Sequence, residues 1–167
     1  MSVGLIVRSS AWGRAIKRFS LVLYIFLLAT VCMLTGCKGE TVFFSSIPSY
    51  PVYLEYDVLA EDPHFVVTNT GAYKTFTEKR YERDAIGFAG IVIFVGFDAQ
   101  YYAFDMGCPV CLRRKQPVEI DGMFASCPVC GEKYDLSYGF ATPSKGISNE
   151  ALRRYDVVFD GRKLVVR

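Results

Sequence analysis

Residues 108–130 read CPVCLRRKQPVEIDGMFASCPVC, so the motif Cys-Pro-Val-Cys occurs twice within a short segment. The four cysteines are Cys108, Cys111, Cys127 and Cys130, and fifteen residues separate the two pairs. Two C-x2-C pairs at this spacing are typical of a metal site with four thiolate ligands. Each pair can direct two sulfurs at one ion, and a hairpin between the pairs brings the two loops face to face. The sequence therefore predicts two loops that converge on a metal.

Short apolar segments around this motif predict β-strands. Residues 91–95 form a continuous apolar run rich in β-branched side chains, which is typical of a buried central strand, and residues 101–104 complete a hairpin with it. Apolar and polar residues alternate over 52–58, which predicts a strand with one buried face. Asp-Gly pairs at 121–122 and 160–161 predict two further hairpins with type I′ turns, because both central residues of such a turn need positive φ. With no convincing helix in this part of the chain, we expect a small all-β domain.

The segment from Cys127 to Gly139 reads CPVCGEKYDLSYG, and it is followed by Pro143, by Leu-Arg-Arg-Tyr at 152–155 and by the last hairpin. This order resembles the second half of the Rieske ferredoxin domain, where a Cys-Pro-x-His-Gly turn precedes Phe-Asp, a proline loop and a hairpin containing Leu-x-x-Tyr. The resemblance covers residues 88–167. It implies a Rieske-like antiparallel sandwich or barrel with two metal-binding loops.

The resemblance also implies an altered ligand set. Rieske centres hold a 2Fe-2S cluster with two cysteines and two histidines. Cys108 and Cys127 match the two cysteines, and Cys130 matches the second histidine. The place of the first histidine holds Val110, with Cys111 one residue later. A true Rieske centre cannot form with these residues, so the resemblance is to a variant with cysteine ligands alone.

Three interpretations of the four cysteines stay open. A zinc ion with four thiolate ligands would fasten the loops without catalysing a reaction. Iron in the same ligands, as a single ion or a 2Fe-2S cluster, would make the protein an electron carrier. Disulfides would staple the loops, because exported thiols tend to oxidise. We favour zinc, because thiolates suit this ion and it needs no assembly machinery outside the cytoplasm.

The N-terminal region has the layout of an export signal. Four basic residues and no acidic residue precede an uncharged, mostly apolar run from Phe19 to Gly36. The run closes with Leu34-Thr35-Gly36-Cys37, which resembles the lipobox of bacterial lipoproteins, whose cysteine is acylated and becomes the mature N-terminus. The alternative is an uncleaved transmembrane anchor. In either case the bilayer is a partner of the chain, through acylation of Cys37 in the favoured interpretation.

These observations divide the chain into three parts. We expect a lipoprotein signal peptide, with a signal helix, at 1–36, a lipidated tether at 37–50 and the Rieske-like domain at 51–167. Lys38 stands where an inner-membrane retention signal would have Asp, which favours the outer membrane. The charged segment 71–84 is expected to form a solvated loop or irregular hairpin.

Charge and composition exclude several classes of function. From residue 38 onward, 15 Lys and Arg stand against 17 Asp and Glu, a net charge of −2 that does not attract nucleic acid. The one histidine, His64, is expected on the surface, and no serine has the surroundings of a nucleophile elbow. Most aromatic side chains, Tyr138 among them, are expected in core or cross-strand packing. We therefore expect no enzymatic activity and no small-molecule substrate, but a structural or interaction module of the cell envelope with an unidentified protein partner.

Overall fold

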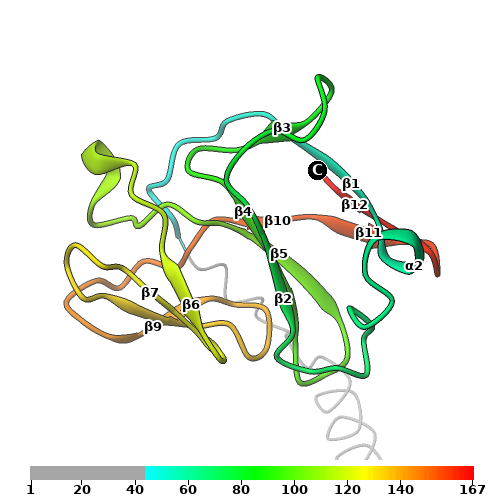
Figure 1. Cartoon of the computed structure of the whole chain (residues 1–167). Coiled ribbons are helices and arrows are strands. Elements are labelled where there is room, and N and C mark those ends of the chain that lie inside the picture. The colour runs from blue at the N-terminus through cyan, green and yellow to red at the C-terminus, as the bar shows by residue number, and fades with distance from the viewer. Residues whose placement is uncertain (1–43) are drawn as a thin grey trace, which may run out of the picture. The chain divides into compact units, whose positions relative to one another are not determined.

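Twelve strands form three antiparallel sheets in residues 44–167, the part of the chain that the computed structural model describes (Figure 1). The strands are β1 (Val52–Asp57), β2 (Tyr73–Phe76), β3 (Ala85–Ile86), β4 (Ile91–Val95), β5 (Tyr101–Asp105), β6 (Glu119–Asp121), β7 (Phe124–Ser126), β8 (Lys133–Asp135), β9 (Thr142–Lys145), β10 (Arg154–Tyr155), β11 (Val157–Phe159) and β12 (Lys163–Val166). The sheet orders are β11-β12-β1-β3, β10-β5-β4-β2 and β6-β7-β8-β9. The predicted antiparallel all-β architecture is confirmed.

Strand β4 lies at the centre of this arrangement, and all five of its residues are buried. It pairs with β5 on one side and with β2 on the other. Val92 and Phe94 belong to one hydrophobic cluster, whereas Ile91, Ile93 and Val95 belong to a second. The apolar run is continuous because both faces of the strand are covered, so no position is left for a polar side chain.

The two clusters connect the central sheet to different neighbours. Figure 1 shows β6, β7 and β9 on one side of β4 and β5, and β1, β11 and β12 on the other. We call the first cluster the loop-side core; it consists of Ile47, Val92, Phe94, Tyr102, Phe104, Met106, Cys108, Val118, Ala125, Cys127, Tyr134, Leu136, Ala141 and Leu152. We call the second the β1-side core; it consists of Leu54, Tyr56, Val58, Phe65, Phe76, Ile91, Ile93, Val95, Tyr101, Ala103, Leu164 and Val166. Two of the four cysteines thus lie in the loop-side core.

The two Asp-Gly hairpins form, but with a different turn from the predicted one. Asp121 pairs with Phe124 in the ladder of β6 and β7, and Asp160 takes the corresponding place between β11 and β12. Each glycine is therefore the first central residue of its turn. Gly122 and Gly161 have φ of 56° and 97°, and no neighbouring turn residue has positive φ. The type I′ prediction is wrong, because only the glycine of each turn has positive φ. In the second turn the carboxylate of Asp160 also accepts hydrogen bonds from the two amides after the glycine.

Residues 52–87 differ from the sequence prediction at two points. The strand predicted over 52–58 ends at Asp57, whose carboxylate accepts a hydrogen bond of 3.0 Å from Ala60 N and caps the short helix α2 (Val58–Glu61). Residues 73–76 form β2 inside the segment expected to be a solvated loop or irregular hairpin, and Phe76 is the only one of its residues that is buried. A 3-10 turn, η1 (Leu112–Arg114), is the other helical piece within residues 44–167.

The predicted signal peptide and signal helix at 1–36, and the predicted lipidation site at Cys37, lie outside the described residues. Within residues 44–167, none of the helices has the length and apolar character that crossing a bilayer requires.

Candidate metal centre

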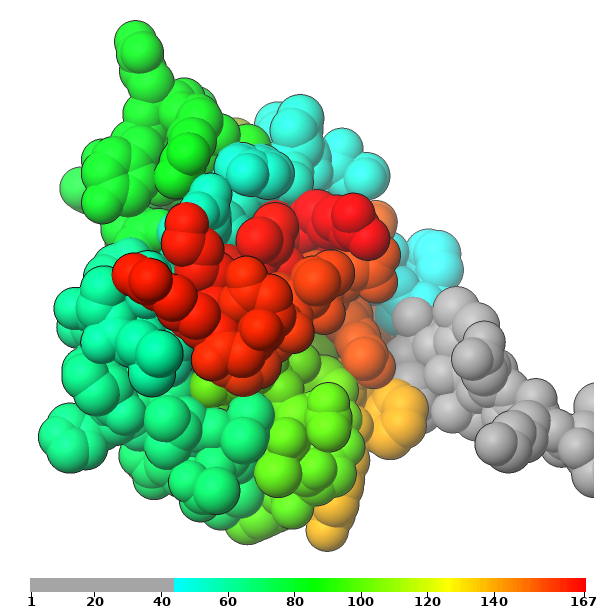
Figure 2. Space-filling model, turned by 90° about the vertical axis from the view of Figure 1, so that its right-hand side faces the viewer, coloured from blue at the N-terminus to red at the C-terminus, as the bar shows by residue number. Residues whose placement is uncertain are grey.

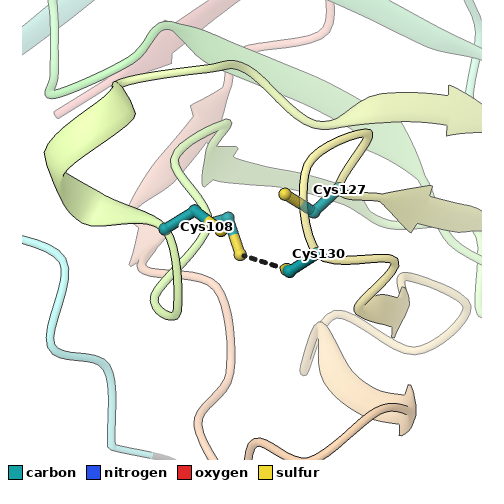
Figure 3. A group of neighbouring side chains, drawn as sticks. Cys108, Cys127 and Cys130 are labelled. Atoms are coloured by element: carbon teal, nitrogen blue, oxygen red, sulfur yellow. Dashed lines mark hydrogen bonds between the residues drawn. The ribbon is translucent and has the colours of Figure 1, made fainter.

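Two loops supply the four cysteines of the motif. Cys108 and Cys111 follow β5, whereas Cys127 and Cys130 lie between β7 and β8. All four Sγ atoms lie within 4.8 Å of one another. Figure 3 shows the side chains of Cys108, Cys127 and Cys130 directed toward a common centre, with 3.6 Å between the Sγ atoms of Cys108 and Cys130. The predicted convergence of the two loops is confirmed.

Each loop surrounds its first cysteine in the same way. In the first loop the backbone amides of Val110 and Cys111 act on the Sγ of Cys108 and lower its pKa, and the amide of Cys111 donates a hydrogen bond of 3.1 Å to the carbonyl of Cys108. The second loop repeats this arrangement at the Sγ of Cys127, again with the amides of its third and fourth residues. The proline at the second position of each loop has no N–H, so it cannot donate a hydrogen bond to the sulfur. Amide dipoles directed at sulfur stabilise a thiolate, which is the form that binds a metal.

Two glycines beside the loops have different roles. Gly131 has φ of 74°, and its amide donates a hydrogen bond of 2.9 Å to the carbonyl of Cys127, which closes the second loop. Gly107 is not left-handed; a Cβ there would lie 2.8 Å from the Phe88 ring. Gly131 is needed for its left-handed conformation, and Gly107 is needed for close packing.

The four thiols differ in exposure and in pKa. Cys108 and Cys127 are each 2% exposed, Cys111 is half-buried and Cys130 is exposed. Burial raises the pKa of Cys108 to about 11, and it also raises the pKa values of Cys111 and Cys130. At Cys127 burial acts in the same direction, but the amides of Cys130 and Val129 outweigh it and hold the pKa below the ordinary value of a thiol. A bound cation deprotonates ligating thiols outright.

The spacing of the sulfurs fits a single ion. Zinc at about 2.3 Å from four tetrahedral sulfurs places neighbouring sulfurs roughly 3.8 Å apart. A 2Fe-2S cluster instead binds two protein ligands on each of two irons, so sulfurs on different irons lie farther apart than sulfurs on one ion. The resemblance assigns Cys108 and Cys130 to different irons, and their Sγ atoms are 3.6 Å apart. Four soft donors gathered within 4.8 Å can hold a metal.

Tyr134 on β8 contacts this group of sulfurs from the loop-side core. Its side chain is fully buried, and its hydroxyl lies 3.4 Å from the Sγ of Cys108. Burial and the neighbouring sulfur raise the pKa of Tyr134, so the phenol keeps its proton. Toward a thiolate this hydroxyl is the donor, because the sulfur has no proton to give. Tyr134 therefore adds a hydrogen bond from a side chain to the sulfur of Cys108.

Asp105 fixes the chain at the start of the first cysteine loop. Its carboxylate is fully buried and accepts hydrogen bonds from the amides of Phe88 (2.7 Å), Ala89 (3.2 Å) and Gly107 (2.7 Å). The hydroxyl of Tyr155 on β10 donates a fourth, at 2.7 Å. A buried carboxylate is tolerated where donors surround it. These four bonds set the position from which the chain enters Cys108.

Glu132 has a similar role after the second loop. It is 2% exposed, and its Oε1 accepts hydrogen bonds from the amides of Ile147 (2.6 Å) and Ser148 (3.2 Å). Its carbonyl accepts a hydrogen bond of 2.8 Å from Cys127 N. A Cβ at Gly146 would lie 2.0 Å from the carboxylate, so the loop after β9 approaches Glu132 as closely as a glycine permits. Glu132 thus joins the second cysteine loop to residues 146–148.

Sequence reasoning found the cysteines but missed Tyr134, Asp105 and Glu132. A repeated spacing reveals the cysteines, whereas no local pattern marks a buried carboxylate or hydroxyl whose partners lie in other strands. His64 is exposed, as predicted. Within residues 44–167, the four cysteines are the one group of histidine, cysteine and carboxylate side chains arranged to hold a metal ion.

Comparison with solved structures gives matches at low sequence identity. One match is the complex of reduced oxygenase and oxidized ferredoxin in carbazole 1,9a-dioxygenase, with 13% identity, a TM-score of 0.45 and coverage of 69% of this chain and 92% of that chain. Another is a Sphingomonas yanoikuyae B1 ferredoxin, with 12% identity, a TM-score of 0.40 and coverage of 60% and 91%. No protein-family model and no curated protein matches the chain.

Proposed function

We propose that this protein is a membrane-anchored lipoprotein whose four cysteines bind one zinc ion that fastens the two loops of a Rieske-like domain. The observation that carries the proposal is the gathering of the Sγ atoms of Cys108, Cys111, Cys127 and Cys130 within 4.8 Å. In this function the domain is a structural or interaction module of the cell envelope and catalyses no reaction.

The closed ligand set supports a structural role for the ion. Four protein ligands leave no open position for water or substrate, so a bound zinc supplies a cross-link. The segment that it would fasten, 108–130, contains η1 and the three-residue strands β6 and β7. Such short elements bury little apolar surface of their own. A cross-link at both ends of this segment would hold it against the loop-side core.

The choice of zinc over iron rests on ligand chemistry and on the expected export. Thiolates bind both ions well, so the donor set alone does not separate them. The apolar signal without a clear twin-arginine motif indicates export as an unfolded chain. An iron-sulfur cluster would then need assembly outside the cytoplasm, whereas zinc binds directly to deprotonated thiols.

The anchoring half of the proposal rests on the sequence of the N-terminal region. Acylation of Cys37 would leave the domain on a tether at the membrane surface, with the outer membrane favoured by Lys38. The domain would there meet a protein partner of the envelope. Loss of membrane association in Cys37→Ala, with the domain still folded, is the outcome expected for a lipid anchor.

Electron transfer by iron is the second candidate, and the exposure of Cys130 favours it. Two ligands, Cys111 and Cys130, lie on the solvent side of the group of sulfurs, whereas Cys108 and Cys127 are buried. An ion held here would lie close to the surface, where electron exchange with another protein is possible. A single iron with four thiolates fits the sulfur spacing as well as zinc does.

Metal analysis of the protein, purified after its natural host cell has exported it into the cell envelope, separates these functions. One zinc per chain and no visible absorption is the expected result. A red-brown protein that dithionite bleaches would replace the zinc function by electron transfer. A metal-free protein lighter by about 4 Da than the reduced chain would show two disulfides instead, because each removes two hydrogens.

A pair of variants in one loop tests the role of the ligands. Cys130→Ser removes a ligand, whereas Val129→Ser changes the neighbouring exposed residue and leaves all four sulfurs in place. We expect zinc loss and a lower melting temperature for Cys130→Ser only. Equal melting temperatures for the two variants would contradict a structural metal.

A further inference from the structure

Two aromatic side chains, which the sequence assigned to no function, lie together on the surface. Phe97 in the turn between β4 and β5 is 47% exposed, and Tyr138 in the loop between β8 and β9 is 59% exposed. Their ring centroids are 5.9 Å apart, and Phe97 N donates a hydrogen bond of 2.9 Å to the carbonyl of Ser137. The backbone contact holds the two turns side by side, so the paired rings are a fixed feature of the surface. For Tyr138 the predicted core or cross-strand packing is wrong.

This aromatic pair continues toward the first described residue of the chain. After Tyr138 comes Phe140, which is 48% exposed, and then Ala141, whose carbonyl accepts a hydrogen bond from Leu152 N at 3.2 Å. The preceding residue, Ala151, donates through its amide to the carbonyl of Phe44 at 3.1 Å. Phe44 is itself 70% exposed. Phe97, Tyr138, Phe140 and Phe44 are therefore exposed aromatic residues on backbone segments that these hydrogen bonds connect, and we call them the aromatic strip.

Figure 2 shows part of this surface. The segment around residue 140, in yellow-orange, lies beside the turn that joins β4 and β5, in yellow-green. Arg154 brings a cation to the same region, because its Nη1 donates a hydrogen bond of 3.1 Å to the carbonyl of Gly139. The nearby carboxylate of Asp98 accepts a hydrogen bond from the hydroxyl of Tyr102, so it is already engaged within the domain.

The position of the strip in the chain indicates what covers it. Phe44 follows Cys37 by seven residues, which span at most about 25 Å when fully extended. A lipid attached at Cys37 would thus keep Phe44 and its neighbours within reach of the headgroups. Aromatic side chains concentrate at the boundary between headgroups and acyl chains, and arginine favours anionic lipids.

We infer that the aromatic strip docks the domain against the lipid surface of the membrane that carries its anchor. The inference rests on the proposed anchoring near Cys37, and it adds an orientation: the side of the domain that holds Phe97 and Tyr138 faces the bilayer. The group of sulfurs belongs to other loops, so docking leaves the four cysteines in place.

Tryptophan fluorescence can locate this side in the full-length protein. The only tryptophan of the chain is Trp12, in the predicted signal peptide, and Trp12→Phe removes it from any uncleaved protein. Tyr138→Trp then places one reporter on the strip. Tyr81→Trp is the matched control, because Tyr81 is also a tyrosine, is 55% exposed and lies in the loop between β2 and β3.

Both variants are purified as lipoproteins and reconstituted in vesicles of phosphatidylethanolamine and phosphatidylglycerol with brominated phosphatidylcholine. Interfacial aromatic groups sink about 5–10 Å into the boundary of headgroups and acyl chains, so we expect bromolipid quenching at least about twofold stronger for Tyr138→Trp than for Tyr81→Trp. Phe97→Glu added to Tyr138→Trp should bring the quenching down to the control value. Equal quenching of the two reporters, or no effect of Phe97→Glu in a protein with unchanged far-UV circular dichroism, overturns the inference.

Mass analysis of the peptide containing Cys37 separates this inference from the proposed anchor. Acylated Cys37 with equal quenching of both reporters overturns the docking and leaves the anchor. Unmodified Cys37 with preferential quenching of Tyr138→Trp overturns the lipid attachment and supports the docking. Unmodified Cys37 with equal quenching overturns both.

Discussion

The hydroxyl of Tyr134 shows how one buried polar group can act on a metal ligand. It lies 3.4 Å from the Sγ of Cys108, inside the loop-side core and away from solvent. Hydrogen bonds to a ligand hold its orientation and tune its charge. Two backbone amides and one phenol therefore surround the sulfur of Cys108, and each lowers the pKa that burial raises.

Removing this hydroxyl should weaken metal binding. For Tyr134→Phe we expect roughly 10-fold lower zinc affinity, because loss of a ligand's hydrogen-bond partner typically costs 10–100-fold. Tyr101→Phe is the control: it removes a buried hydroxyl that donates to the Phe65 carbonyl at 2.7 Å in the β1-side core. Competition with a chromogenic chelator measures both. Equal affinities for Tyr134→Phe and Tyr101→Phe would refute a role for the hydroxyl at the sulfur.

Tyr102 should make the domain sensitive to alkaline pH. Burial, together with the hydrogen bond to Asp98 and its charge, raises the pKa of Tyr102 to about 12 from a usual value of 10.0. The unfolded chain loses this proton first, so stability is fully present below pH 10 and declines as the pH rises toward 12.

The decline is measurable by urea unfolding between pH 9 and 12. Tyr102 should account for on the order of 2 kcal/mol of it, since each pH unit between the two pKa values corresponds to about 1.4 kcal/mol. Tyr102→Phe should flatten the curve by this amount, and the slope that remains should come from the other groups with raised pKa values, among them Tyr134, Tyr155 and Cys108. An unchanged slope in Tyr102→Phe would be incompatible with this assignment.

At the residue scale, the sequence predicts ligands better than it predicts their partners. The C-x2-C spacing reveals Cys108 in the first pair and Cys130 in the second, because the two cysteines of each pair lie within one turn. Tyr134 and Asp105 escape prediction because their function depends on contacts between separate strands. For Asp105 the decisive partner is Tyr155, fifty residues away.

Strand β4 separates the domain into two regions of packing. Val92 and Phe94 face the loop-side core, and Ile91, Ile93 and Val95 face the β1-side core. Each buried side chain of this size contributes about 1.5–3 kcal/mol by its removal from water. A substitution in β4 therefore disturbs the surroundings of the cysteines or the pairing of the chain ends, according to the face that it occupies.

Val92→Ala and Val95→Ala form a matched test of this division. Both valines are fully buried, so we expect each variant to lose about 2 kcal/mol of unfolding free energy. The two variants should then differ in which backbone amides exchange their hydrogens faster. Val92→Ala should speed exchange in residues 106–136, and Val95→Ala should speed it in β1 and β12.

Faster exchange over the same amides in both variants would show that the two cores open as one unit. In that case the division seen in side-chain packing would not extend to local stability.

The elements recovered from the sequence are those with an unambiguous pattern. β4 is predicted because an apolar residue fills every position. β2 is missed because only Phe76 of Tyr73–Phe76 is buried, and the other three residues look like a solvated loop. The hairpin at Asp121-Gly122 is predicted, but its register depends on which residue takes positive φ, and glycine alone does so.

At the scale of the whole domain, long-range pairing completes the sheets. Leu54 on β1 pairs with Val166 on β12, and Tyr155 on β10 pairs with Ala103 on β5. Neither pairing leaves a local signal, because strands so far apart in the sequence share no turn. The sequence therefore predicts the strands and the all-β class, whereas the division into three sheets required the structure.

Metal removal should affect the domain unevenly. An ion present at 1,000 times its Kd stabilises the folded state by about 4 kcal/mol, so a chelator should lower the Tm by roughly 10 °C or more. The loss should begin in segment 108–130, where limited proteolysis would cut first. An identical Tm and cleavage pattern with and without chelator would contradict a metal that supports the fold.

The unequal burial of the four sulfurs has a consequence for the kinetics of metal exchange. Because Cys108 and Cys127 are buried, a competing molecule would first meet the exposed Cys130 and the half-buried Cys111 of a bound ion. Replacement of the ion would then proceed by stepwise ligand substitution, with Cys130 leaving first, and its rate would depend on the size of the incoming molecule.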